Sequence, residues 1–430
     1  MTEEELKFLL FSPEGESLEK RYRYYNEAAL FHLLLKSRKE MKKLGEDAPP
    51  ELKFLPLVVN QIRLRRQAAT KFTRAEKMFF TSKGLEQASS EEVANHIAER
   101  FSPDWRVADL TAGLGGNTIS LAARCKWVMA IDPDKTALTL AWANVQAYNV
   151  MGRIEFVNNS IESILEENKE ILEGYDALFL DPSRQRPGKT KTRSILNSQP
   201  RILDIWEQLN SITKNIAIKI SPAFDYKELE LIPEKPEIEL ISSSNVNQAA
   251  ILWFGKLKRV RKSASIIFDK HILTLQNKTT AASGGLALGV DVPEDRVLFV
   301  DGPQKYLYEL NKAVTKARLI DVAALNFSLA RWHHQVSLLT SDKLLEAALI
   351  TESIFARVWE IEEQGEFSWS KLQKVVSKNN LYRIKVIVKN YPIKPEEVYE
   401  RTGLRQGGDL FLIITVLANN KAHYILARRL

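Results

Sequence analysis

Cysteine is nearly absent from this chain. Its 430 residues contain one cysteine, Cys125, and 6 histidines. A single cysteine forms no disulfide within the chain and builds no zinc site of several cysteines. The sequence also lacks an apolar run of the roughly 18 residues that span a bilayer, and its first residues are acidic. These absences exclude disulfide-stapled and membrane-spanning proteins, and we expect a cytoplasmic protein that binds no metal and no membrane.

Charge and composition leave several classes open. The net charge is +7, hydrophobic residues make up 45% of the chain and charged residues 27%. These fractions are those of ordinary globular proteins, and the length favours two or three domains. A mildly basic balance is compatible with a polyanionic partner such as a nucleic acid but does not identify one.

A glycine-rich turn between an apolar strand and an apolar helix is the most informative stretch. Residues 107–118 read VADLTAGLGGNT, and ISLAA follows. The glycines Gly113, Gly115 and Gly116 permit a sharp turn and a close approach of the backbone to a ligand. The start of the next helix offers free N–H groups to an anion. The pattern predicts a nucleotide-type cofactor site.

A nicotinamide-dependent dehydrogenase is the rival interpretation of these glycines. Its fingerprint, G-x-G-x-x-G, needs a third glycine three residues after the second. Counted from Gly113 and Gly115, that position is Thr118. The motif therefore departs from the dehydrogenase form.

Polar residues follow three further predicted strands. The first of these polar residues is Asp132. It comes about twenty residues after the glycines, where a carboxylate can bind ribose hydroxyls. Because the carboxyl ends of parallel strands meet at one edge of an open sheet, we expect a doubly wound α/β sheet with its ligand site at that edge. The strands are predicted at 127–131, 154–157 and 176–180, and the residues that follow them are Asp132, Asn159 with Ser160, and Asp181.

This series of motifs resembles the class I S-adenosylmethionine-dependent methyltransferases. The glycine motif and the helix IDPDKTALTLAWANVQAYNV are most similar to the trimethylguanosine-synthase type of RNA methyltransferase, over roughly residues 86–260. Downstream, YLYELNKAVTKARLIDVAA and the closing YRIKVIVKNYPIKPEEVYERTGLRQGGDLFLIITVL resemble bacterial methyltransferases of this type that end in a ferredoxin-like segment and a THUMP-like domain. The motifs that carry the first resemblance are DLTAGLGG at 109–116, DPD at 132–134, NS at 159–160 and DPSR at 181–184.

The resemblance implies an α/β fold with a Rossmann-like seven-stranded methyltransferase sheet. An N-terminal helical domain and a C-terminal α+β domain, ferredoxin-like and THUMP-like, complete the expected architecture. The expected domains are an N-terminal helical domain at 1–85, the methyltransferase domain at 86–268, a linker and ferredoxin-like segment at 269–330, and the THUMP-like domain at 331–430.

The implied cofactor is S-adenosyl-L-methionine, and its chemistry requires no metal. In the family the glycine turn lies against the methionine part, the carboxylate at Asp132 accepts hydrogen bonds from the ribose, and residues beside Asn159 border the adenine. The residues expected to bind the cofactor are Asp109, Thr111, Gly113, Gly115, Gly116, Asp132, Asn159 and Ser160.

The acceptor is expected where the fourth strand ends. Methyltransferases of exocyclic amines carry a D/N-P-P-F/Y/W motif there. This chain keeps Asp181 and Pro182 but has Ser183 and Arg184 in place of the second proline and the aromatic residue, which bears against guanine N2 methylation. Arg184 can stack on a base or bind a phosphate. We therefore assign Asp181, Pro182, Ser183 and Arg184 to catalysis.

The pattern D-P-x-R is also similar to that of uridine C5 methyltransferases. Those enzymes attack the ring with a cysteine. Cys125 falls near the end of the helix behind the glycine turn, away from Asp181. We therefore do not expect that mechanism.

Basic stretches favour RNA as the substrate. The loop Arg184–Arg193 is basic beside the predicted reaction centre, and the segment Lys371–Lys389 combines cations with aromatic residues that can stack on bases. A solvated surface is the alternative explanation, and we favour it for a third run, Arg63, Arg65 and Arg66. We expect methylation of a base in RNA. The alternatives are a protein or small-molecule acceptor, and a non-catalytic RNA-binding protein that retains the cofactor fold.

Overall fold

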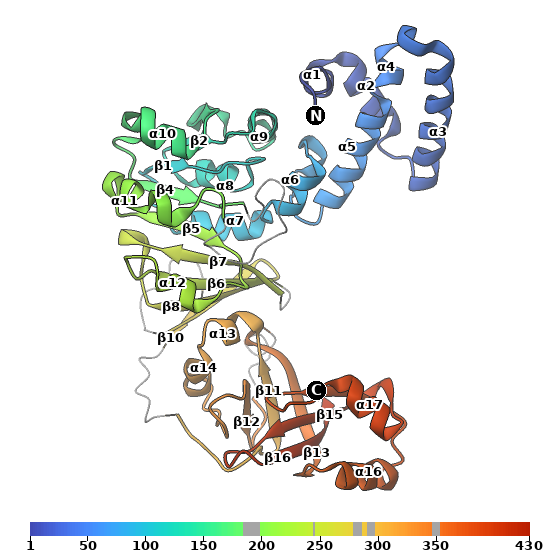
Figure 1. Cartoon of the computed structure of the whole chain (residues 1–430), viewed down its shortest axis with the longest axis vertical. Coiled ribbons are helices and arrows are strands. Elements are labelled where there is room, and N and C mark those ends of the chain that lie inside the picture. The colour runs from blue at the N-terminus through green and yellow to red at the C-terminus, as the bar shows by residue number, and fades with distance from the viewer. Residues whose placement is uncertain (184–197, 244–245, 278–285, 290–296, 346–352) are drawn as a thin grey trace. The chain divides into compact units, whose positions relative to one another are not determined.

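The computed structural model describes residues 1–183, 198–243, 246–277, 286–289, 297–345 and 353–430 (Figure 1). The chain forms two compact units. The first contains Met1–Lys235 and Leu252–Leu257, and the second contains Pro236–Ile251 and Lys258–Leu430. No described helix is long and apolar enough to cross a bilayer.

Helices make up the first part of the first unit, and side chains cap the starts of the first three. Thr2 forms a capping box with Glu5, and the side chains of Ser12 and Asn26 accept hydrogen bonds from the first turns of the next two long helices. Apolar side chains of these helices share one core, formed by Phe8, Leu18, Leu30, Phe54, Leu55, Val58, Val59 and Ile62. The helices are α1 (Glu3–Phe11), α2 (Pro13–Tyr22), α3 (Glu27–Leu44), α4 (Pro50–Lys53), α5 (Leu55–Ala68), α6 (Ser82–Gln87) and α7 (Glu91–Ala98).

Parallel strands in the order β5-β4-β1-β2-β3 form the sheet of the first unit. The strands β4 and β5 are buried along their whole length, as expected of strands covered on both faces. Chain order reverses between β1 and β4, which makes this point a topological switch where ligands bind in open α/β sheets. The strands are β1 (Arg106–Asp109), β2 (Trp127–Ile131), β3 (Ile154–Val157), β4 (Ala177–Leu180) and β5 (Ile216–Ile220).

Helices connect these strands, and the predicted strands 127–131 and 154–157 occur at the predicted bounds. The connecting helices are α8 (Gly116–Arg124), α9 (Lys135–Ala147), α10 (Ile161–Glu167), α11 (Ile202–Ile212) and α12 (Tyr226–Leu229). Strand β7 (Val246–Trp253) is divided between the units, with Val246–Ile251 in the second and Leu252–Trp253 in the first.

The second unit contains two groups of strands. The first group has the order β10-β9-β8-β6, and the second is a six-stranded sheet in the order β12-β11-β13-β16-β15-β14. The first group consists of β6 (Glu237–Ser243), β8 (Lys262–Phe268), β9 (His271–Gln276) and β10 (Leu286–Gly289). The second consists of β11 (Tyr306–Leu310), β12 (Leu338–Ser341), β13 (Phe355–Glu366), β14 (Arg383–Val388), β15 (Arg405–Val416) and β16 (Ala422–Arg429).

Successive side chains of β15 contribute in turn to the apolar clusters on the two faces of the six-stranded sheet. Leu412 and Ile414 belong to one apolar cluster, and Phe411 and Ile413 belong to another, because successive side chains of a strand point to opposite faces. The helices of this unit are α13 (Lys312–Lys316), α14 (Ile320–Asn326), α16 (Trp369–Lys378) and α17 (Pro395–Thr402).

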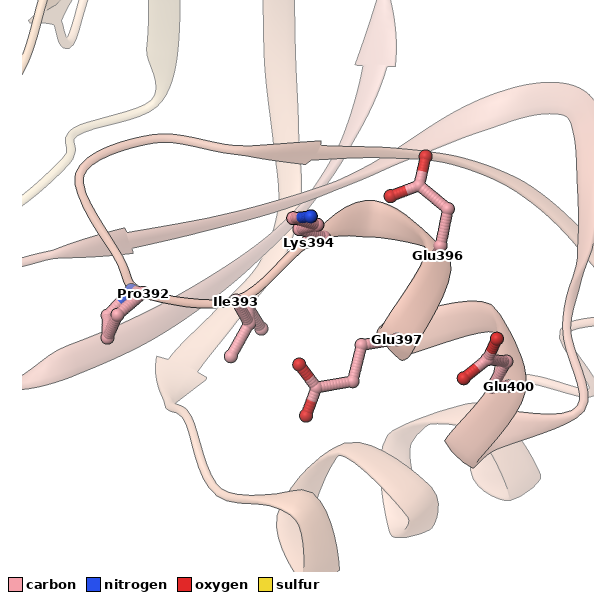
Figure 2. A pocket seen from close by; sticks show the side chains of 6 residues that line it. All are labelled: Pro392, Ile393, Lys394, Glu396, Glu397 and Glu400. Atoms are coloured by element: carbon pink, nitrogen blue, oxygen red, sulfur yellow. The ribbon is translucent and has the colours of Figure 1, made fainter.

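A hollow of about 660 Å³ lies at the start of α17 (Figure 2). Three of its lining side chains are carboxylates, and two of them, Glu396 and Glu397, lie in the first turn of the helix, where negative charge suits the helix dipole. It is lined by Pro392, Ile393, Lys394, Glu396, Glu397 and Glu400.

Candidate active site at the carboxyl edge of the parallel strands

The strand ends of the first unit bring the predicted polar residues to one edge. Asp109 is the last residue of β1, and Asp132 and Asp181 directly follow β2 and β4. Because β1 lies between β2 and β4, the glycine turn that follows β1 is flanked by a carboxylate on each side. This geometry agrees with a ligand site at the switch point of the sheet.

The glycines of the turn serve different needs. Gly113 has φ +53°, and a Cβ atom added to it meets no atom within 4 Å, so its backbone is open to a ligand. Gly115 has φ +85° and precedes α8, and a Cβ atom there would lie 3.2 Å from the Cβ of Ala141 on α9. Gly113 therefore provides an accessible backbone, and Gly115 permits tight packing between the turn and α9.

Asp132 holds the glycine turn. Its Oδ2 accepts a hydrogen bond of 2.8 Å from the N–H of Gly113, and its Oδ1 accepts one of 2.9 Å from the N–H of Asp134. Burial raises the pKa of Asp132 above its ordinary value, and these two backbone donors oppose the rise. The side chain is thus fixed at the end of β2 beside the open backbone of Gly113.

Asp109 lies beneath the turn and is fully buried. The hydroxyl of Thr118 donates to its Oδ2 over 2.7 Å, and the N–H of Thr111 donates to its Oδ1 over 3.3 Å. Burial raises the pKa of Asp109 to about 7. Thr118, which replaces the third glycine of the dehydrogenase fingerprint, therefore has a defined structural partner.

Asp181 is held by three groups of the first unit. Its backbone N–H donates to Thr111 Oγ1 over 2.6 Å, Lys219 Nζ forms an ion pair with its Oδ2, and Asn117 Nδ2 lies 3.4 Å from the same oxygen. The side chain of Lys219 is 6% exposed and that of Asp181 24% exposed. Within the described residues, no hydrogen bond engages Asp181 Oδ1, so this oxygen is available to a ligand.

Lys219 is the residue that sequence reasoning left without a role. It lies near the end of β5, in the otherwise apolar strand IAIKI. A charge in a buried strand requires a partner, and this requirement is the signal that the sequence offers. The partner could not be named without the strand order, which places β5 beside β4.

The remaining predicted residues make local contacts. Pro182 is buried, and Ser183 exchanges backbone hydrogen bonds of 2.9 and 3.1 Å with Gln199. Asn159 Oδ1 accepts from the N–H of Ser160 over 2.8 Å, and Ser160 Oγ caps α10. Arg184 and the basic loop up to Arg193 lie outside the described residues.

The end of the N-terminal helical segment is fastened to the glycine turn, which the motifs did not indicate. Asn144 on α9 donates to the carbonyl of Leu114 over 3.0 Å and to that of Phe79 over 3.1 Å. It also accepts a hydrogen bond of 2.7 Å from the N–H of Phe79. A Cβ atom added to Gly84 of α6 would lie 2.3 Å from Leu114 Cδ1, so α6 packs directly on the turn.

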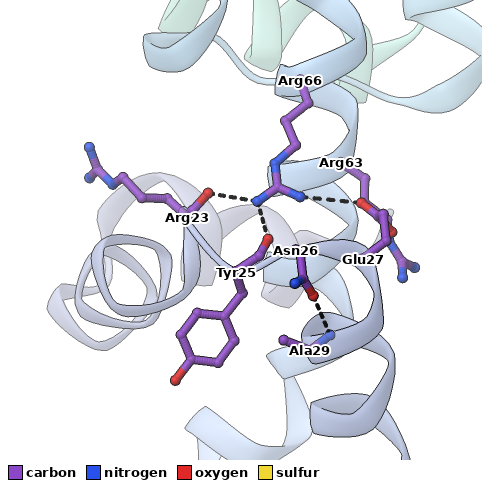
Figure 3. A network of polar contacts seen from close by, with 7 residues as sticks. All are labelled: Arg23, Tyr25, Asn26, Glu27, Ala29, Arg63 and Arg66. Atoms are coloured by element: carbon purple, nitrogen blue, oxygen red, sulfur yellow. Dashed lines mark hydrogen bonds and ion pairs between the residues drawn. The ribbon is translucent and has the colours of Figure 1, made fainter.

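The arginines of α5 make contacts within the first unit although Arg66 stays exposed, and Figure 3 shows two of them, Arg63 and Arg66. Arg63 Nε lies 2.8 Å from Glu27 Oε2, and Arg66 Nη1 lies 3.3 Å from Oε1 of the same residue. Arg66 also donates to two backbone carbonyls before α3. Arg65 pairs with Glu19 at 3.2 Å and is largely buried. These contacts tie α2 and α3 to α5.

Cys125 is unsuited to nucleophilic attack. It is fully buried at the end of α8, and burial raises the pKa of its thiol to about 12. Among the described residues, no group of three or more His, Cys, Asp or Glu side chains is placed to hold a metal ion.

Two family models match the chain. Residues 105–218 match the model of RNA cap guanine-N2 methyltransferases, and residues 356–429 match that of THUMP-like domains. Residues 105–218 are thus similar to a family of RNA methyltransferases, and residues 356–429 to THUMP-like domains. The resemblance seen in the sequence motifs is confirmed, as is the fold class, with a methyltransferase α/β sheet and a C-terminal THUMP-like domain.

Similar proteins agree with the methyltransferase domain. An uncharacterized S-adenosylmethionine-dependent methyltransferase of Mycobacterium tuberculosis is 23% identical over 86% of this chain and 96% of that relative. A 23S rRNA (uracil(1939)-C(5))-methyltransferase of Burkholderia cenocepacia is 32% identical over 20% of this chain and 18% of that relative. The crystal structure of a presumed methyltransferase from Porphyromonas gingivalis W83 has a TM-score of 0.68 at 20% identity, covering 94% of this chain and 99% of that chain, and shows the shared fold.

Proposed function

We propose that this chain transfers the methyl group of S-adenosylmethionine to a base in RNA. One observation carries the proposal: two carboxylates flank the open glycine turn at the switch point of the sheet. Asp132 lies on the β2 side, and Asp181, paired with Lys219, lies on the β4 side. A donor on one side and an acceptor on the other would meet at the turn.

The residues on the donor side fit S-adenosylmethionine. The accessible backbone of Gly113 suits close contact with the methionine part, and Asp132 can accept hydrogen bonds from ribose hydroxyls. The cofactor supplies a methyl group on a positively charged sulfur, and the carboxylates around the turn favour a cationic ligand electrostatically. Asp109 and Thr118 support the turn from beneath.

Asp181 is placed to orient the acceptor. Lys219 and Asn117 both engage Oδ2, which leaves Oδ1 to accept a hydrogen bond from an N–H group of the acceptor. Such a contact would aim the acceptor atom at the methyl carbon, and orientation supplies much of the acceleration in this kind of displacement. The bond between the acceptor and carbon forms as the carbon–sulfur bond breaks, and a proton displaced from the acceptor passes to water.

RNA as the acceptor is supported by the THUMP-like domain and by the relatives. One relative is named as an rRNA methyltransferase that acts on uracil C5. The buried thiol of Cys125 argues against methylation of uracil C5 by this chain, because attack on that ring carbon needs an accessible thiolate. We therefore place the target at another atom of an RNA base.

The decisive experiment is transfer of labelled methyl from S-adenosylmethionine to total RNA from cells that lack this protein. We expect label in a single nucleoside, identified by mass spectrometry, and its loss in Asp181→Ala, which removes the accepting oxygen. Label recovered only in proteins or small molecules would favour the alternative acceptors. RNA binding without any transfer would favour a non-catalytic RNA-binding protein.

A further inference from the structure

Cations of the C-terminal unit divide into paired and unpaired groups. Three of the paired cations lie on α16 or directly after β14, and each has a glutamate as partner. Their distances are 2.5 Å for Lys371–Glu366, 3.0 Å for Lys378–Glu363 and 2.8 Å for Lys389–Glu309. These charges are internally compensated, so they are poor candidates for phosphate contacts.

Three exposed cations lie near one another where β14 begins beside β15. Arg383, Lys385 and Arg405 are exposed, and none lies within ion-pair distance of a carboxylate in the part of the chain that the structure describes. Arg383 and Arg405 are partners in the parallel ladder between the two strands. Residues paired in this way point to the same face of a sheet, so their charges add on one surface.

An exposed aromatic side chain lies within this cluster. Tyr382 is 58% exposed although the guanidinium of Arg405 lies 5.2 Å from the centre of its ring. The N–H of Arg405 also donates to the carbonyl of Tyr382 over 2.9 Å, which fixes the two backbones together. A large exposed ring held beside arginines is the combination that binds unpaired bases, by stacking, and phosphates, by charge.

The backbone of β14 at this edge of the sheet does not favour pairing with an added strand. The hydroxyl of Tyr399 on α17 donates to the carbonyl of Ile384 over 3.1 Å and accepts from the N–H of Val386 over 3.0 Å. These backbone groups of β14 are thereby satisfied within the unit. A partner at this place would therefore be recognised by side chains and not by main-chain pairing.

The hollow at α17 offers the opposite charge. Its carboxylates, Glu396, Glu397 and Glu400, would repel a polyanion (Figure 2). Of these two surfaces, charge complementarity therefore favours the one around Tyr382 for a nucleic acid.

We propose that Tyr382, Arg383, Lys385 and Arg405 form a docking surface for single-stranded RNA. The ring of Tyr382 stacks on an unpaired base, and the three cations contact the phosphates on either side of it. The identity of the partner rests on the proposed function, whereas the place of binding rests on the unpaired charges and the exposed ring.

The test compares two double variants of the full-length chain that remove equal charge from the same unit. Arg383→Ala/Arg405→Ala should weaken binding of a labelled 12-nucleotide single-stranded RNA about tenfold or more. It should also flatten the log–log salt dependence by about 1.4, for two contacts at about 0.7 each. The matched control, Lys371→Ala/Lys378→Ala, should change affinity less than about twofold. Tyr382→Ala should lose about tenfold and Tyr382→Phe should bind as the unchanged chain does, since stacking needs the ring and not the hydroxyl.

The outcomes separate this surface from the proposed function, because binding is measured without S-adenosylmethionine. Equal losses in the two double variants, or no loss in either, would overturn the surface even if methyl transfer to RNA occurs. Selective loss in Arg383→Ala/Arg405→Ala supports the surface even if no transfer is found. Thermal unfolding midpoints equal to that of the unchanged chain show that the exposed substitutions leave the fold intact.

Discussion

Lys219 and Asp181 form an ion pair across the neighbouring strands β5 and β4, at the edge where the glycine turn lies. The ammonium is almost fully buried, whereas 24% of the aspartate side chain reaches the surface. A buried ammonium that lost its partner would be costly, so the pair is mutually required. The arrangement leaves one carboxylate oxygen for a ligand and fixes the other.

We predict that Lys219→Met lowers both stability and methyl transfer. The free energy of unfolding should fall by about 2 kcal/mol, less than the roughly 3–5 kcal/mol for a fully buried pair, because Asp181 keeps some solvent contact. The turnover number should fall at least about tenfold, because Asp181 loses its orientation. Denaturant unfolding and a methyl-transfer assay measure the two effects.

The double variant Asp181→Ala/Lys219→Met is the control for that prediction. Removing both charges leaves no unpaired ion, so stability should recover toward that of the unchanged chain while transfer stays low. Recovery of transfer in the double variant would show that Asp181 does not contact the acceptor.

Asp132→Ala should weaken S-adenosylmethionine binding by about 1–3 kcal/mol, measured by titration calorimetry. The substitution removes an acceptor for ribose hydroxyls and also the partner of the Gly113 N–H, so charged hydrogen bonds are left unmade. Asp134→Ala is the matched control. Asp134 caps α9 by accepting from the N–H groups of Thr136 and Ala137, so its loss should cost about 1 kcal/mol of stability with little change in affinity. Equal affinity losses in both variants would count against a ribose contact at Asp132.

The sequence predicted which residues lie at the ligand-binding edge of the sheet, because a simple rule places them there. Apolar runs bounded by polar residues marked β2 and β3, and the carboxyl ends of parallel strands meet whatever the loops do. Asp132 and Asp181 therefore flank the turn as expected. The ion pair with Lys219 could not be predicted, because it depends on which strand lies beside β4.

Charge runs were less informative, because their meaning depends on distant partners. Arg63 and Arg66 read as a solvated face, yet both contact Glu27, more than thirty residues earlier in the chain. The basic segment Lys371–Lys389 likewise contains cations that glutamates on other elements neutralise. A single sequence shows where the charged residues are, but it does not show which residues of opposite charge pair with them.

Gly84→Ala should reduce both stability and donor affinity. The added methyl would lie 2.3 Å from Leu114 Cδ1, so the buried Leu114 side chain, α6 or the glycine turn must shift, at about 1–3 kcal/mol. Gly152→Ala is the control, because a Cβ atom there meets nothing within 4 Å. Thermal unfolding and calorimetric titration with S-adenosylmethionine measure both effects. A stable Gly84→Ala variant with unchanged affinity would show that α6 does not position the turn.

The pKa of Asp109 makes stability depend on pH. Burial raises this pKa from 3.8 to about 7, so between these values the folded chain holds a proton that the unfolded chain releases. The contribution of Asp109 to stability is therefore full below about pH 4, declines as pH rises toward 7, and is lost above it. At about 1.36 kcal/mol per pKa unit, the loss is on the order of 4 kcal/mol.

Asp109→Asn should remove that pH dependence, since the amide stays neutral and the hydroxyl of Thr118 can turn to meet it. The free energy of unfolding of the variant minus that of the unchanged chain should be larger at pH 8 than at pH 5. The reason is that only the unchanged chain must bury a charge at pH 8. Urea unfolding at pH 5, 6, 7 and 8 measures this difference, and comparing the two proteins cancels the titration of the other carboxylates. Asp204→Asn, at an exposed carboxylate on α11, should shift the curve equally at every pH. If Asp109→Asn kept the pH profile of the unchanged chain, Asp109 would have to be ionised throughout this range, and the buried carboxylate beneath the glycine turn would be a fixed negative charge facing the donor.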